Sequence, residues 1–235
     1  MDRVLVALIV IAIGALMVRS FARAFFYPIP SGMPEPDQVD IASALARFEA
    51  ALGKYAPQVL AKLQPGLTQE QIREIESKHR LCLTEELRAL YRWRNGTPRA
   101  SLVTLIPGHT FLPLEEAAAM RDELRRQAAA APVVQRLSYS LFAGHRATWI
   151  TILDDLCGDG YFYDSGRRGL EGSFFYHFAE DRTYRYFPSV VNFLSGASEF
   201  YEAGIYRSNS KGEVSENVER AFALWPRYAS WPGKT

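Results

Sequence analysis

Apolar residues in the first part of the chain recur every three or four positions, which predicts amphipathic helices. The first predicted helix carries the apolar residues Ile41, Leu45, Phe48, Leu52 and Tyr55. Asp37 precedes this run and is expected to cap the N-terminus of the helix. A second helix is expected after the capping-box pair Thr68 and Gln71, and a third after Thr84. The third helix should end at Asn95-Gly96, since both residues tolerate the left-handed conformation found beyond helix C-termini.

Beyond Gly96 the pattern changes to short aromatic and β-branched runs separated by Asp/Gly turns, which predicts strands. The expected elements are a strand at 102–106, a helix at 114–127, strands at 149–153, 161–164 and 173–178, a further strand at 184–187, and a closing helix from Pro188 that Gly196 interrupts. The connections between the strands are too short for the crossovers that parallel pairing requires. The sequence therefore predicts an α+β fold with an antiparallel sheet of about four to six strands packed with helices.

The N-terminal segment, residues 1–27, is predicted to be a transmembrane anchor. Val4 to Val18 is apolar apart from Gly14, and it would form a helix of roughly 22 Å, short of the roughly 30 Å hydrocarbon core. The following stretch, 19–27, adds two snorkelling arginines and four aromatic residues, so the two together can span a bilayer. The alternatives are a cleaved signal peptide, which would leave a secreted or periplasmic domain, and a buried core helix. The arginines after the span favour a cytoplasmic C-terminal domain under the positive-inside rule.

The rest of the chain divides into a spacer, a domain and a tail. Residues 28–36 are proline-rich and predict a short, stiff spacer. Residues 37–207 form the expected globular domain, and 208–235 the tail. The tail is polar up to Asn217 and then carries apolar residues, which either dock back onto the domain or meet a partner.

Charge and cysteine content narrow the class of protein. With 27 basic and 26 acidic residues the net charge is +1, which argues against a dedicated nucleic-acid binder. Two cysteines, Cys82 and Cys157, lie far apart and fit free thiols in a reducing compartment better than a disulfide.

No spacing typical of catalysis or metal binding is found, so no cofactor is expected. The four histidines lie thirty or more residues apart, which excludes a helical His pair as a zinc site. The acidic stretch from Asp154 to Gly160 fails as an EF-hand, because Gly166 stands where a bidentate Glu belongs. A tight turn between two strands is the better interpretation of this stretch. The basic residues Arg121, Arg125 and Arg126 are interpreted as a solvated helix face, with contact to anionic lipid as the alternative.

Two segments carry recognisable signatures, 83–96 (LTEELRALYRWRNG) and 149–164 (WITILDDLCGDGYFYD). Together they resemble the signatures of the SUKH superfamily, the Smi/Knr-type cell-wall-assembly regulator domains and their bacterial relatives. The resemblance covers about residues 65–194, with Thr84 and Thr151 at positions where the family usually has proline. The N-terminal anchor and the tail lie outside the family pattern.

This resemblance implies a non-enzymatic α+β domain that works by binding proteins, as in bacterial immunity proteins that neutralise toxins. The function expected is therefore that of a membrane-tethered immunity protein with a protein partner, a cognate toxin, and no nucleic acid. The alternatives are an envelope or cell-wall regulatory scaffold and a hydrolase with a cryptic carboxylate site around Asp154 and Asp159. Because interfaces favour Trp, Tyr and Arg, and because polar turns are exposed, the partner surface is predicted at the following residues: Trp93, Arg94, Asp155, Asp159 and Tyr163.

Overall fold

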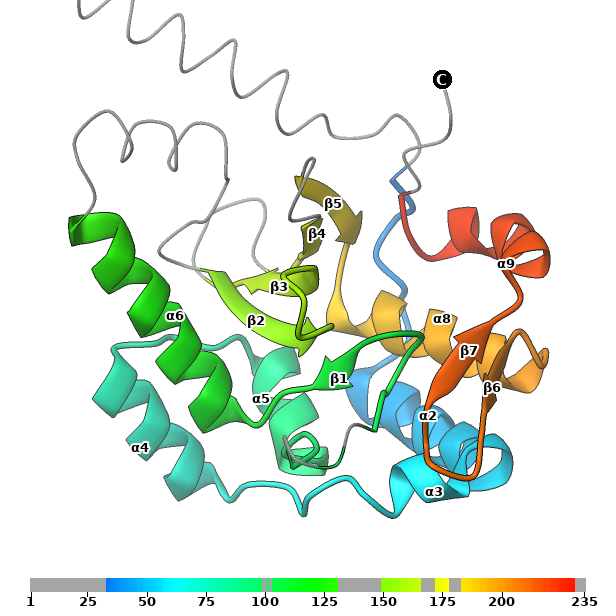
Figure 1. Ribbon diagram of the computed structural model, residues 1–235, viewed down its shortest axis with the longest axis horizontal. Coiled ribbons are helices and arrows are strands. Elements are labelled where there is room, and N and C mark those ends of the chain that lie inside the picture. The colour runs from blue at the N-terminus through cyan, green and yellow to red at the C-terminus, as the bar shows by residue number, and fades with distance from the viewer. Residues whose placement is uncertain are drawn as a thin grey trace, which may run out of the picture.

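Helices surround an antiparallel sheet in the computed structural model (Figure 1), which describes residues 33–98, 101, 103–130, 149–165, 172–177 and 183–230. The helices are α2 (Ile41–Tyr55), α3 (Pro57–Leu60), α4 (Gln69–His79), α5 (Glu85–Trp93), α6 (Leu114–Ala130), α8 (Val190–Glu202) and α9 (Val218–Leu224), followed by the 3-10 turn η2 (Trp225–Arg227). The strands of the main sheet are β1 (Thr110–Phe111), β2 (Trp149–Asp154), β3 (Gly160–Asp164), β4 (Phe174–His177) and β5 (Thr183–Phe187). A hairpin of β6 (Tyr206–Ser208) and β7 (Val214–Glu216) forms a second, smaller sheet.

The main sheet is a meander in which each strand pairs with the next in the chain. Its order is β1-β2-β3-β4-β5, and every pair is antiparallel. The α+β class and the antiparallel sheet predicted from the sequence are confirmed. The predicted strand at 102–106 is wrong in position: residues 103–106 form a loop and an isolated bridge, and the first strand is β1.

Helix caps fix where the N-terminal helices begin. The capping box at α4 is confirmed, because the Gln71 N–H donates to Thr68 Oγ1 (3.2 Å) and the Thr68 N–H to Gln71 Oε1 (2.8 Å). Thr84 caps α5 as predicted, accepting from the Leu87 N–H. At α2 the cap is Asp40 and not Asp37.

Asp37 instead ties the start of the domain to α8. Its side chain accepts from Ser195 Oγ (2.8 Å), and its backbone N–H donates to Asn192 Oδ1 (2.9 Å). The backbone carbonyl of Glu35, at the end of the predicted spacer, accepts from the Asn192 amide. The chain therefore enters the fold against α8.

The core lies between the sheet and the pair α2 and α8. Phe193 of α8 sits at its centre, with ring centroids 5.4 Å from Phe174, 5.5 Å from Phe187 and 6.3 Å from Phe48 of α2. These four rings are at most 2% exposed. Sheet strands and helices far apart in sequence are thereby packed into one hydrophobic cluster.

Gly196 does not interrupt α8, contrary to the prediction. The helix runs from Val190 to Glu202 without a break. A Cβ at position 196 would lie 3.0 Å from Tyr228 Cβ, so the glycine provides the room in which the C-terminal segment packs.

Residues 208–230 return to the domain. The boundary predicted at 208 falls at the end of β6, and the segment beyond it contains β7, α9 and η2. Trp225 is 6% exposed, and its ring lies 4.5 Å from Phe200 and 5.3 Å from Tyr186. Of the two fates left open for this segment, the structure places it against the core.

The predicted anchor, residues 1–27, lies outside the described residues. Within the part of the chain that the structure describes, no helix is both long enough and apolar enough to cross a membrane.

Candidate functional site

Trp93 and Arg94 lie at the C-terminal end of α5, and both hydrogen-bond the carboxylate of Glu49 on α2. The Trp93 indole N–H donates to Glu49 Oε2 (3.0 Å), and Arg94 Nη2 donates to Glu49 Oε1 (2.6 Å). The Arg94 guanidinium also lies 5.7 Å from the Trp93 ring centroid. Phe48 supports the indole from the core side at 5.6 Å between centroids. The two predicted residues therefore form one pre-organised, half-buried surface cluster.

Asp155 and Asp159 lie in the β2–β3 turn, where Asp155 organises the backbone. Its Oδ1 accepts from the N–H groups of Cys157 (2.8 Å), Gly158 (2.9 Å) and Asp159 (2.9 Å). Leu156 and Gly158 both have positive φ, as a tight turn requires. The turn predicted here is confirmed, and it leaves both carboxylates half-buried.

Tyr163 is part of the core and not of the surface, which corrects its assignment as a contact residue. Its side chain is 0% exposed, and its hydroxyl hydrogen-bonds Thr84, the N-cap of α5. Burial raises the pKa of Tyr163 above its ordinary value. Its role is to fasten β3 to the start of α5.

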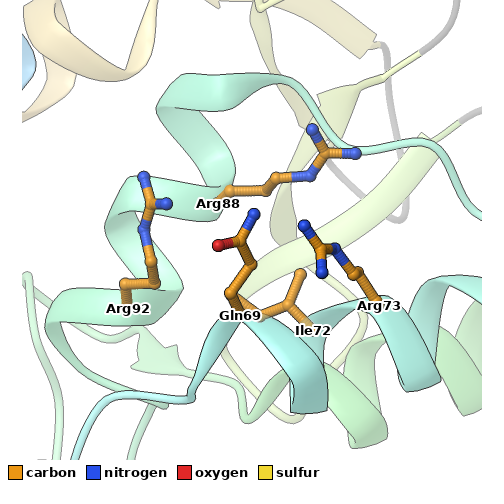
Figure 2. Close-up of a pocket in the computed structure, with 5 residues that line it drawn as sticks. All are labelled: Gln69, Ile72, Arg73, Arg88 and Arg92. Carbon is orange, nitrogen blue, oxygen red and sulfur yellow. The ribbon is translucent and has the colours of Figure 1, made fainter.

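A pocket lies between α4 and α5 and is lined by arginines (Figure 2). Gln69, Ile72 and Arg73 reach into it from α4, while Arg88 and Arg92 reach into it from α5. Its volume is about 120 Å³. Ile72 is 1% exposed, so its side chain supplies an apolar floor beneath polar walls.

The three arginines of this pocket differ in how they are paired. Arg88 binds both oxygens of Glu76, with Nη2 2.8 Å from Oε1 and Nε 3.3 Å from Oε2, and it also pairs with Glu85. The hydrogen bonds that Arg88 donates to Glu76 raise the pKa of Arg88. The guanidinium groups of Arg73 and Arg92 have no hydrogen bond or ion pair with any described residue, and both side chains are exposed. The pocket thus carries a positive charge that its own walls do not neutralise.

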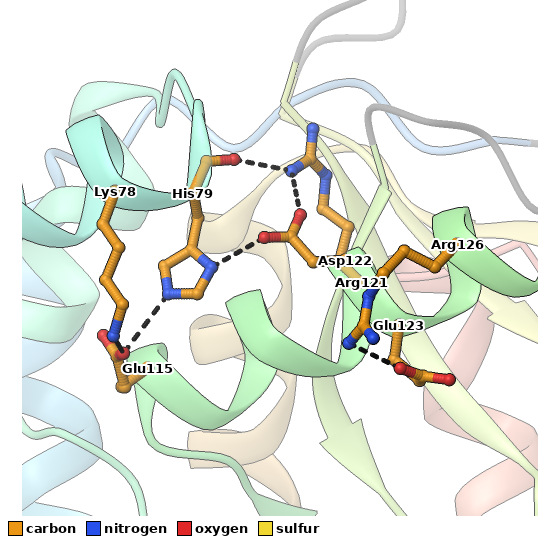
Figure 3. A network of polar contacts seen from close by, with 7 residues as sticks. All are labelled: Lys78, His79, Glu115, Arg121, Asp122, Glu123 and Arg126. Carbon is orange, nitrogen blue, oxygen red and sulfur yellow. Dashed lines mark hydrogen bonds and ion pairs between the residues drawn. The ribbon is translucent and has the colours of Figure 1, made fainter.

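A second polar network joins α4 to α6 and is structural (Figure 3). The His79 ring, 8% exposed, lies between two carboxylates, with Nδ1 2.8 Å from Asp122 Oδ2 and Nε2 3.2 Å from Glu115 Oε1. Arg121 Nη1 donates to the His79 carbonyl (3.1 Å) and to Asp122 Oδ1 (3.3 Å). These contacts join the end of α4 to α6. Arg121 is 8% exposed, contrary to the solvated face predicted for it.

Comparison with known families decides the class of protein. The family model described as SMI1 / KNR4 family (SUKH-1) matches residues 66–196, which is more than half of the 235 residues. The chain belongs to the SMI1/KNR4 family. No curated protein matches it.

The SUKH-1 match runs from just before α4 into α8, close to the span of 65–194 expected from the two signatures. The arginine pocket, Trp93, Arg94 and the β2–β3 turn all lie inside it. Glu49, which positions Trp93 and Arg94, lies outside the match on α2. The SUKH-1 domain thus depends on a neighbouring helix for the geometry of one of its surface clusters.

The predicted contact residues of this SUKH-1 chain do not gather in one place. Trp93 and Arg94 meet at the end of α5, and Asp155 and Asp159 meet in the β2–β3 turn. The residues missed from the sequence are Arg73, Arg88 and Arg92. A signal for two of them was present, since Arg88 and Arg92 are four residues apart and share a face of α5. The position of Arg73 opposite them depends on how α4 packs.

Histidines and cysteines supply no cluster of metal ligands in the described ranges. No group of three or more His, Cys, Asp or Glu there is arranged to hold a metal ion. Both cysteines are free, the state that the sequence favoured, and both are exposed. His109 is 8% exposed, with Nδ1 2.8 Å from the Pro107 carbonyl, and burial lowers its pKa.

Proposed function

We propose that this SUKH-1 protein is a non-enzymatic binding protein that is tethered to a membrane and neutralises a cognate toxin. Membership of the family supports a protein-binding role, either in toxin immunity or in the regulation of cell-wall assembly. The observation that carries the proposal is the family match over a domain whose surface offers pre-organised aromatic and charged side chains. Interfaces are held chiefly by such residues, and Trp and Arg are the commonest anchors.

Trp93 and Arg94 are the proposed anchors at one edge of the partner surface. Their geometry is set before binding by Glu49, so little side-chain entropy remains to be lost on association. Asp155 and Asp159 are proposed to contribute a separate, acidic contact at the β2–β3 turn. The turn is held by backbone N–H groups that donate to the side chain of Asp155.

The tether is proposed from the sequence of residues 1–27, with the SUKH-1 domain on the cytoplasmic side. Carbonate extraction of membranes tests the tether, since a spanning protein stays in the pellet. Protease treatment of spheroplasts tests the side, because a cytoplasmic domain is protected until the membrane is lysed. If carbonate released the protein from the membrane, the proposed membrane tether would be wrong.

The function is tested by affinity capture of the detergent-solubilised, full-length protein, with mass spectrometry of what co-purifies. A single stoichiometric toxin-like partner, whose toxicity is suppressed on co-expression, is the expected result. The variant Trp93→Ala/Arg94→Ala should lose capture and protection, while Tyr55→Ala, an exposed aromatic on α2, should keep both.

Two other outcomes would replace the proposal. Stoichiometric capture of wall-synthesis or division proteins, with altered cell shape on deletion, would indicate an envelope scaffold. Hydrolytic turnover that is lost in Asp154→Asn and Asp159→Asn, with the fold intact, would indicate an enzyme.

A further inference from the structure

The arginine pocket between α4 and α5 has features of a binding site that the structure itself does not use. Arg73 and Arg92 pair with none of the residues that the structure describes, although acidic side chains on the same two helices pair with Arg88. Arg88 is compensated by its two carboxylates, but placing the guanidinium groups of Arg73 and Arg92 around one small volume is electrostatically unfavourable without an anion to pair with them. The first turn of α4, which carries the partial positive charge of a helix N-terminus, lines the same pocket through Gln69.

The size of the pocket limits what it can hold. At about 120 Å³ it is well above the roughly 10–15 Å³ that one water requires. It is also well below the roughly 300–1,000 Å³ of sites for drug-sized molecules and cofactors. A single side chain with a charged end therefore fits this volume better than a nucleotide or a metabolite.

The chemistry of the walls favours a carboxylate. Guanidinium groups bind planar carboxylates in a bidentate manner, and Arg88 already does so with Glu76 in this place. The buried Ile72 at the floor suits the methylene groups of an aspartate or glutamate side chain.

The position of the pocket favours a protein over a lipid surface. In Figure 1 the chain enters the described fold in the region of α8 and α9, whereas α4 lies on the far side of the domain. An N-terminal tether would hold the first region toward a membrane and leave the α4–α5 side facing away from it.

We propose that the pocket of Arg73, Arg88 and Arg92 receives an aspartate or glutamate side chain from an acidic segment of the partner protein. This inference rests on the proposed protein-binding function and adds the chemistry of the partner. Arg73 and Arg92 make the new contacts, and Arg88, held by Glu76, completes the wall.

The test uses the full-length protein in nanodiscs of phosphatidylcholine, with fluorescence anisotropy of a fluorescein-labelled glutamate hexapeptide. A glutamine hexapeptide is the uncharged probe. The pocket variant is Arg73→Gln/Arg92→Gln. The matched control is Arg125→Gln/Lys211→Gln, which removes the same charge from exposed positions on α6 and the β6–β7 hairpin.

We expect the glutamate peptide to bind the wild type and the glutamine peptide not to bind. The pocket variant should weaken binding at least about tenfold, or about 1.4 kcal/mol, and the control less than about twofold. The variant Arg73→Lys/Arg92→Lys keeps the charge but loses the bidentate geometry, and it should show an intermediate loss. It also keeps the test decisive if the glutamine variant fails to fold.

Equal weakening by the pocket and control variants would overturn the proposal, since binding would then follow net charge alone. Binding to phosphatidylserine vesicles that depends on Arg73 and Arg92, without peptide binding, would assign the pocket to lipid and also overturn it. The two proposals fail separately. If a toxin is captured and the pocket variant still binds it at full affinity, the pocket proposal is wrong and the proposed function stands. If the glutamate peptide binds specifically to the pocket but no toxin partner is captured, the proposed function is wrong and the pocket proposal stands.

Discussion

At the scale of single residues, side chains whose chemistry would suit a functional site instead stabilise the fold. Tyr163 illustrates this, because its hydroxyl links β3 to the cap of α5 while its ring is fully buried. A buried tyrosine needs a partner for its hydroxyl, and removing that pair costs roughly 0.5–1.5 kcal/mol. The contacts of Tyr163 therefore indicate a structural role for this residue.

The substitution Tyr163→Phe should lower the free energy of unfolding by about 1 kcal/mol, measured by urea denaturation. Tyr55→Phe on α2 is the control, since Tyr55 is 36% exposed and should change stability by less than about 0.5 kcal/mol. Partner affinity should be unchanged in Tyr163→Phe. Loss of affinity with unchanged stability would return Tyr163 to the contact surface.

His109 should make stability depend on pH. Burial lowers the pKa of His109 below 6.5, although Asp155, Asp159 and Asp154 oppose the shift. The unfolded chain then binds a proton that the folded chain does not, so the contribution of His109 is present above about pH 6.5 and is lost as the pH falls below it. Burial raises the pKa values of Glu86 and Glu216, so the folded chain binds protons there that the unfolded chain has lost. Their contribution to the free energy of unfolding therefore decreases as the pH rises above about 4.5, which is opposite to the effect of His109.

The measurement is the free energy of unfolding between pH 7.5 and pH 5.5, roughly one unit either side of the ordinary histidine pKa. Wild type should lose stability on acidification, and His109→Gln should lose less. Parallel curves for the two proteins would show that His109 does not titrate differently on folding.

At the scale of elements, close backbone approaches determine where α5 ends and hence where its charged side chains point. Gly66 lies against the last turn of α5, where a Cβ would come within 1.7 Å of the Arg92 carbonyl oxygen. The Leu67 N–H donates to the Tyr91 carbonyl, and Pro65 forms a bridge with Arg94. The segment before α4 therefore fixes the backbone at the end of α5, from which Arg92, Trp93 and Arg94 project.

Gly66→Ala should destabilise the protein by about 1–3 kcal/mol, because the added methyl group meets backbone and not a mobile side chain. Gly53→Ala in α2 is the matched control, with its Cβ 3.7 Å from Leu60 in ordinary contact. It should stabilise the protein by about 0.5–1 kcal/mol through helix propensity. Thermal unfolding of both variants checks the opposite signs.

The sequence predicted most elements because their signals are local. The caps at Thr68 and Thr84, the Asp/Gly turn after β2 and the aromatic strands all depend on neighbours within a few residues. Elements set by distant contacts were missed. β1 is two residues long and is defined by its pairing with β2, and Gly196 lies in a continuous helix where Tyr228 occupies the space that a side chain would take.

The candidate site was harder to predict than the fold. Trp93 and Arg94 were predicted as contact residues from their types, a prediction that stays open, but their common partner Glu49 lies more than forty residues earlier, on α2. The arginine pocket depends on the packing of α4 against α5, and hydrophobic periodicity carries no information on which exposed residues face each other.

At the scale of the whole molecule, the C-terminal segment completes the core. Trp225 contacts Tyr186 and Phe187 of β5 and Phe200 of α8, so η2 covers the junction of sheet and helix. The family match ends at residue 196, before this segment begins. The folding unit is thus longer than the family domain at both ends, since α2 also packs on α8.

Trp225→Ala should lower the free energy of unfolding by about 3–5 kcal/mol, as expected for truncating a buried aromatic. Val218→Ala in α9, at a side chain 54% exposed, should change it by less than about 0.5 kcal/mol. Guanidinium denaturation followed by circular dichroism measures both. A small effect of Trp225→Ala would mean that the segment is detachable.

The two free thiols lie beside two of the three proposed contact surfaces, the arginine pocket and the β2–β3 turn. Cys82 precedes Leu83, whose N–H donates to Glu76 (2.7 Å), the carboxylate that binds Arg88 of the pocket. Cys157 lies in the Asp155 turn, and both thiols are exposed. The protein thus carries one site for alkylation next to the pocket and one in the β2–β3 turn. Rates of maleimide labelling, with and without a bound partner, would report which surface is covered before any residue is substituted.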